Sequence, residues 1–216
     1  MLSTLALVQG GDTGVLEHMS SVLRWLHVWA GVIWIGHLYF FNFVNSFTMP
    51  KLDGPTKKAL VPQLMPRALF WFRMGAAMTW VTGIVLFAII YMMQKNFWEG
   101  QSSANPISNR GWWILLGVVF GTVMAFNVWF IIWPNQKNKI IPAIRDGVAP
   151  DAAAVKLATN ASKLNTYLSV PLLASMVSQH FSMWIGQPQI YIPVVCVTGW
   201  GFTWLLYKQS ANVKSM

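Results

Sequence analysis

The chain has 216 residues, of which 55% are hydrophobic and only 10% are charged. Because soluble domains carry about 25% charged residues, this composition excludes an ordinary water-soluble fold and indicates one integral membrane domain, residues 1–216. The formal net charge of +9 does not indicate a nucleic-acid partner, since the Lys and Arg residues gather between apolar blocks, as the positive-inside rule describes.

The apolar residues fall in five blocks, each long enough for a helix to cross a bilayer core about 30 Å thick. Backbone groups in lipid must be satisfied within each segment, so we expect helices and not strands. The predicted fold class is therefore all-α, an integral membrane bundle of five transmembrane helices. The predicted spans cover residues 20–47, 68–93, 111–133, 164–185 and 190–207.

Basic residues test this count, because a correct set of spans places Lys and Arg on alternate sides of the membrane. The segments after the first and third predicted spans are rich in Lys and Arg, whereas those after the second and fourth are nearly neutral. This alternation predicts an outside N-terminus and a cytoplasmic C-terminus. We expect a multi-pass membrane protein, surrounded by membrane lipids. Residues 1–14 lack a basic n-region and a long apolar core, so we expect no cleaved signal peptide.

The segment 134–163 is the longest between predicted spans, and we expect a cytoplasmic loop with a short helix. Pro150 followed by Asp151 is typical of a capped helix start. Gly117 and Gly121 form a GxxxG pattern, which permits close approach to another helix without identifying it. The single cysteine, Cys196, lies in an apolar run and is expected to be a packing residue.

Two histidines are predicted to lie at similar depth in the outer half of the membrane. His27 is about two turns into the first span, and His180 is near the end of the fourth, which runs outward. This arrangement suits bis-histidine ligation of one haem b between two helices. Gly31, one turn from His27, would leave room for a flat ring, and Arg24 could pair with a propionate. The alternative is that both histidines are interfacial residues with hydrogen bonds to neighbours.

His37 and Arg73 are two further costly groups within the predicted spans. His37 lies about 15 Å deeper than His27, so it cannot bind the same iron. It could ligate a second haem with Met74 or Met78 or an open position, or form a hydrogen bond to another helix. Arg73 could bind a second propionate or a quinone, or extend its charged group toward water.

Other chemistry has little support in the sequence. There is no HExxH metal motif, no glycine-rich phosphate loop and no CxxCH motif for covalent haem. Asp and Glu are absent from the predicted spans, which argues against a carboxylate proton relay through this chain. Catalytic residues are not identified.

Several motifs resemble the membrane domain of the bacterial membrane-bound, cytochrome-c-linked urate oxidases (urate hydroxylases). They occur in order in four of the five predicted spans, and the runs from Ile132 to Lys137 and from Asn165 to Pro171 are the most specific. The matching residues are Arg24-Trp25-Leu26-His27-Val28, Gly31, Trp34-Ile35-Gly36, Thr79-Trp80, Gly83, Asn127-Val128-Trp129, Ile132-Trp133-Pro134-Asn135-Gln136-Lys137, Asn165-Thr166-Tyr167-Leu168, Pro171 and Ser178-Gln179-His180-Phe181.

This resemblance implies a multi-helix membrane domain in the bacterial inner (cytoplasmic) membrane. In the family this domain is usually followed by a cytochrome c domain that would accept electrons from urate. We expect a short form that lacks the cytochrome c domain, because CxxCH is missing. His37 also follows the Trp-Ile-Gly motif where a small residue is expected. The resemblance favours haem ligation by His27 and His180.

Three functions are compatible with the sequence. The preferred hypothesis is a b-type cytochrome-like subunit that transfers electrons within a larger respiratory or photosynthetic assembly. Its partners would be other membrane subunits and either cytochrome c or quinone. The second is a urate oxidase-like oxidoreductase that passes electrons to a separate cytochrome c. The third is a non-redox structural subunit of a membrane complex.

Overall fold

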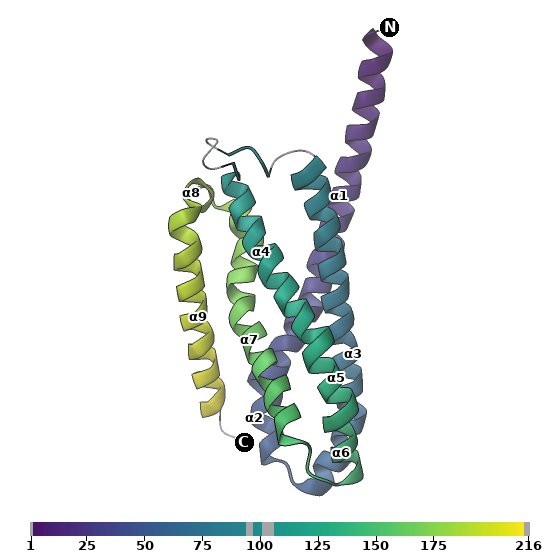
Figure 1. Ribbon diagram of the computed structural model, residues 1–216, viewed down its shortest axis with the longest axis vertical. Coiled ribbons are helices and arrows are strands. Elements are labelled where there is room, and N and C mark those ends of the chain that lie inside the picture. The colour runs from purple at the N-terminus through teal and green to yellow at the C-terminus, as the bar shows by residue number, and fades with distance from the viewer. Residues whose placement is uncertain (1, 94–96, 101–105, 214–216) are drawn as a thin grey trace.

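A computed structural model describes residues 2–93, 97–100 and 106–213, with side chains described from residue 14 onward. These residues form helices and no strand, so the all-α prediction is confirmed. The long helices run alternately in opposite directions, and the two termini lie toward opposite ends of the bundle (Figure 1). The N-terminal part of α1 extends beyond the other helices.

The helical runs contain α-helical, π-helical and 3-10 pieces. The first run comprises α1 (Leu2–Tyr39), η1 (Phe40–Asn45), α2 (Ser46–Thr48) and η2 (Met49–Lys51), and the second comprises α3 (Gly54–Phe87) and η3 (Ala88–Met93). The third comprises α4 (Asn109–Phe126), η4 (Asn127–Ile132), α5 (Trp133–Asn135), η5 (Gln136–Ile140) and α6 (Ile141–Asp146). The remaining elements are α7 (Ala152–Val177), η6 (Ser178–His180), α8 (Ser182–Gly186) and α9 (Pro188–Asn212).

Four of the described helical runs are long and apolar enough to cross a membrane. They cover residues 14–51, 54–93, 109–146 and 188–212. The chain is therefore a multi-pass membrane protein whose helices contact lipid. The α7 helix is not among the four, so the predicted count of five spans and the orientation of the termini stay predictions.

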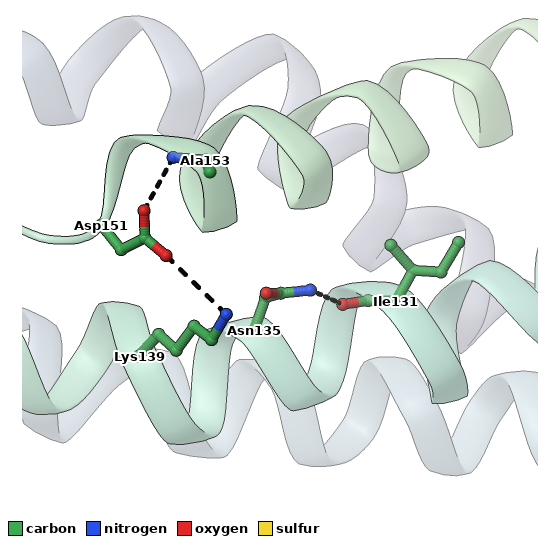
Figure 2. Close-up of polar contacts among 5 residues, drawn as sticks. All are labelled: Ile131, Asn135, Lys139, Asp151 and Ala153. Carbon is green, nitrogen blue, oxygen red and sulfur yellow. Dashed lines mark hydrogen bonds and ion pairs between the residues drawn. The ribbon is translucent and has the colours of Figure 1, made fainter.

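The start of α7 is fixed by the predicted cap. Asp151 Oδ1 accepts the backbone N–H of Ala153 at 2.9 Å, and its other carboxylate oxygen lies 3.7 Å from Lys139 Nζ (Figure 2). The preceding segment is helical as far as Asp146, where we expected a loop. The helix ends at Gly147, whose φ of +78° is the left-handed conformation that glycine adopts readily at a helix C-terminus.

The core lies between α1, α3, η4 and α7. Trp34 and Phe72 are each 1% exposed, and Leu38 is completely buried among the same helices. The helix that packs against the predicted GxxxG pattern is α7. A Cβ on Gly117 would lie 2.9 Å from Ser175 Oγ and would overlap the Met176 side chain, both on α7. The missing side chain at Gly117 therefore allows α4 and α7 to pack closely.

Candidate functional site

His27 lies on α1 and faces α3, where its Nδ1 is 3.1 Å from Thr82 Oγ1. Thr82 has a single hydroxyl proton, and its Oγ1 lies 2.6 Å from the Met78 carbonyl, which can only accept. The threonine therefore donates to Met78 and accepts from His27, so Nδ1 of the imidazole carries the proton. In the neutral ring, Nε2 then has a free lone pair, which is the state that a metal ligand requires.

The position of the His27 ring depends on a glycine of α3. A Cβ on Gly83 would lie 2.9 Å from His27 Cε1 and 3.4 Å from Nδ1, so a larger residue would displace the imidazole. Gly31 is different, because the nearest atom to a Cβ there is Thr79 Cγ2 at 4.0 Å, an ordinary contact. The side of α1 at Gly31, which we predicted to leave room for a flat ring, therefore faces α3.

The other groups predicted to bind the haem are exposed. His180 is exposed in η6, directly after α7. Arg24 is exposed on α1. Both Arg24 and Arg110, at the start of α4, interact electrostatically with the buried Tyr91. Within the described residues, no hydrogen bond joins the rings of His27 and His180, and no cluster of three or more His, Cys, Asp or Glu could hold a metal ion. Haem ligation by the two histidines stays a prediction.

His37 also has a defined proton position. Its Nδ1 lies 2.8 Å from the carbonyl of Ile33, one turn earlier in α1, so Nδ1 must donate and Nε2 has a free lone pair. The ring lies 6.5 Å from that of Phe41. The hydrogen bond is thus made within its own helix and not to another one. Within the described residues, the contacts of the His37 ring are with Ile33 and Phe41 and not with Met74 or Met78. A second haem at His37 stays a prediction.

Arg73 lies among aromatic rings between α3 and the helix formed by η4 and α5. Its guanidinium carbon is 4.0 Å from the centre of the Trp133 ring, 5.5 Å from that of Trp129 and 5.8 Å from that of Phe70. The indole N–H of Trp129 donates to the Arg73 carbonyl at 3.2 Å, which joins the two helices at this level. The buried Nε of Arg73 has no hydrogen-bond partner.

Our reading of the sequence missed a buried polar face of α7. Its members are Asn165, Thr166, Ser169 and Ser175 of α7, continued by Ser178 at the start of η6, none more than 2% exposed. Asn127 of η4 donates to Asn165 at 2.8 Å, and Tyr39 of α1 shares a hydrogen bond with Ser169 at 3.0 Å. A helical spacing was the available signal, because Thr166 and Ser169, and Ser175 and Ser178, are each three positions apart and the two pairs are nine positions apart. Charged and imidazole groups alone do not mark this face, since all its members are neutral.

Two asparagines that contact other helices lie in π-helical turns. Asn42 in η1 donates to Ser162 of α7 at 2.8 Å and accepts from Tyr207 of α9 at 2.7 Å, and Asn127 lies in η4. A π turn inserts one residue into a helix and changes which side chains face inward. These hydrogen bonds join α1, η1 and η4 to α7, and α9 to η1.

Comparison with known proteins gives a family but no individual relative. A family model described as urate oxidase N-terminal matches residues 52–103 and 100–214, well over half of the chain. The matched region contains Arg73, Thr82, Gly83 and His180, whereas His27 precedes it. No curated protein and no solved structure matches the chain.

Proposed function

This chain belongs to the urate oxidase N-terminal family, and on that premise we propose that it is a membrane-embedded redox subunit of the urate oxidase type that binds haem b through His27. The observation that carries this proposal is the hydrogen bond from His27 to Thr82, which leaves Nε2 available to a metal. Such a second hydrogen bond is characteristic of histidines that ligate metals. Bound haem b would supply one-electron transfer.

A buried donor without an acceptor also supports a non-protein group inside the bundle. Trp34 lies about two turns from His27 on the same face of α1, since seven residues separate them. Its side chain is 1% exposed, yet its indole N–H has no hydrogen-bond partner. Buried donors are almost always paired with protein, water or a ligand, so an acceptor such as a water molecule or a bound non-protein group would satisfy Trp34.

His180 is our proposed second ligand. It follows α7 at the end of the bundle where α8 lies, and the chain enters the bundle through α1 at that same end (Figure 1). Its ring is exposed, so ligation would not require the loss of a packed core position. Arg24, one turn before His27, would pair with a propionate.

We further propose that α7 is a fifth span, with the N-terminus outside and the C-terminus in the cytoplasm. Its low apolar content does not exclude this, because Asn165, Thr166 and Ser169 are completely buried. Polar groups in a membrane helix are tolerated where they face other helices. The alternation of connecting segments rich in Lys and Arg with nearly neutral ones supports the orientation.

The first test is a reduced-minus-oxidised absorption spectrum of the purified protein. We expect a b-type α-band that is lost in His27→Ala and His180→Ala. His18→Ala is the matched control, because His18 is an exposed histidine of the same helix and should leave the band unchanged. Thr82→Val should weaken haem binding by about 10-fold or more, since partners of a ligand histidine typically contribute this much. A wild-type protein without the band would refute haem binding.

The family match favours urate as the electron donor, and the motif resemblance implies a cytochrome c as the acceptor. Urate added to the oxidised haem protein should therefore produce the reduced spectrum, and His27→Ala should abolish this reduction. If dithionite reduces the haem but urate does not, the chain is an electron-transfer subunit that receives electrons from another donor. A protein that binds no haem and retains full stability would instead be a structural subunit.

A further inference from the structure

Arg73 and Lys137 place two positive charges on one indole. The Lys137 ammonium lies 5.8 Å from the centre of the Trp133 ring, and the guanidinium carbon of Arg73 lies 4.0 Å from the same centre. Aromatic faces attract cations, but two neighbouring cations also repel each other. The pair therefore creates a local site of positive potential beside the membrane-spanning part of α3.

No carboxylate in the described residues neutralises this pair. The ion pairs in that part of the chain are Lys139 with Asp151 and Arg145 with Asp146. The Nε–H of Arg73 is buried and lacks an acceptor, so this donor has lost its hydrogen bonds to water without gaining one to the protein. Leaving such a group unpaired is costly. Because Arg73 as a whole is only half-buried, an anion outside the chain can approach the accessible part of its side chain and compensate the charge.

A groove adjoins the same group of side chains. It has a volume of about 630 Å³ and is lined by Pro62, Gln63, Pro66, Arg67, Phe70 and Trp71. Phe70 belongs to both features, because its ring lies 5.8 Å from the Arg73 guanidinium. Phe70 and Trp71 are 43% and 50% exposed, so the surface beside the cations is apolar and open. An amphiphile with an anionic head and an apolar tail matches this combination.

We propose that Arg73 and Lys137 bind the phosphate group of an anionic phospholipid, whose glycerol and acyl region occupies the groove at Phe70. Basic pockets beside transmembrane helices bind anionic lipid head groups in this way. A neutral quinone would accept a hydrogen bond from Arg73 but would leave both charges uncompensated, so the phosphate is the better match. This site is separate from the proposed haem ligands and goes beyond the redox function.

The test is native mass spectrometry of the full-length, delipidated protein titrated with phosphatidylglycerol or with phosphatidylcholine of the same acyl chains. Wild type should bind one phosphatidylglycerol in preference to phosphatidylcholine. Arg73→Gln and Lys137→Gln should each weaken phosphatidylglycerol binding about fivefold, as expected for the loss of one basic group near anionic lipid. Because Lys137 is exposed, its variant keeps the test valid if Arg73→Gln does not fold.

Lys208→Gln is the matched control, since Lys208 also lies over an indole, 5.3 Å from the centre of the Trp204 ring. It should leave phosphatidylglycerol binding unchanged. Equal binding of the two lipids to wild type, or an equal loss in Lys208→Gln, would overturn the proposal. Sodium phosphate distinguishes the source of the phosphate: binding of inorganic phosphate without any lipid preference would show a free-anion site and overturn the lipid. If decylubiquinone displaces phosphatidylglycerol, and does so equally well in Lys137→Gln, the site binds a quinone. That result would also overturn the proposal.

Discussion

Replacing Gly75 with alanine should loosen the contact between α1 and α3 that positions His27 and Arg73. A Cβ on Gly75 would lie 2.9 Å from the backbone nitrogen of Trp34 and 3.2 Å from the carbonyl oxygen of Ala30. Both obstacles are backbone atoms of α1, so a change of side-chain rotamer cannot relieve the overlap. The helices would have to move apart.

Two opposing effects set the magnitude. Alanine is about 1 kcal/mol more favourable than glycine within a helix, whereas overpacking a close contact costs about 1–3 kcal/mol. Because backbone is the obstacle, we expect the upper part of that range and a net loss of about 1–2 kcal/mol in the free energy of unfolding. Gly36→Ala in α1 is the matched control, since a Cβ there has nothing within 4 Å. It should increase stability by up to about 1 kcal/mol.

The assay is reversible unfolding of the haem-free protein in mixed micelles, with far-UV circular dichroism measured against the mole fraction of SDS. The two variants should shift the midpoint in opposite directions. A Gly75→Ala protein as stable as Gly36→Ala would refute the close contact between α1 and α3.

Two further predictions concern a buried amide and a helix cap. Asn165→Ala removes the acceptor of Asn127 and leaves a buried donor unpaired, so we expect a loss of about 1–3 kcal/mol in the same unfolding assay, with the exposed Asn160→Ala close to wild type. Asp53 lies between the first two candidate spans, and its hydrogen bonds with Thr56 hold the pKa of its carboxyl below the ordinary value of 3.8. Because the pKa is depressed in the folded state, the ionised Asp53 stabilises the start of α3 fully at pH values above 3.8. This stabilisation is lost as the pH falls through the lower pKa of the folded state. Hydrogen exchange at the start of α3 should accelerate in this acid range in wild type but not in Asp53→Asn.

The composition and the capping residues were sufficient to predict much of the fold. Long apolar blocks required helices in lipid, and Asp151 was identified as the start of α7 because a side-chain acceptor at that position satisfies free backbone N–H groups. The predicted third span ends at residue 133, whereas the helix continues through α5, η5 and α6 to Asp146. Pro134 and Pro142 lie inside this helical run, next to the π-helical turns η4 and η5, and such local changes of helix type accommodate the missing N–H of a proline. Where the membrane-spanning part ends stays a prediction.

Apolar length and motif order can be read directly from the chain, so the sequence was enough to identify a multi-pass helical membrane protein with motifs of the urate oxidase family. The atoms that contact one another could be identified only from the packed helices. The tertiary structure gave Nδ1 of His27 its acceptor on Thr82, placed Arg73 against Trp133, and buried the polar face of α7. These contacts depend on helix rotation and on π turns such as η4, where one inserted residue changes the side that faces the bundle.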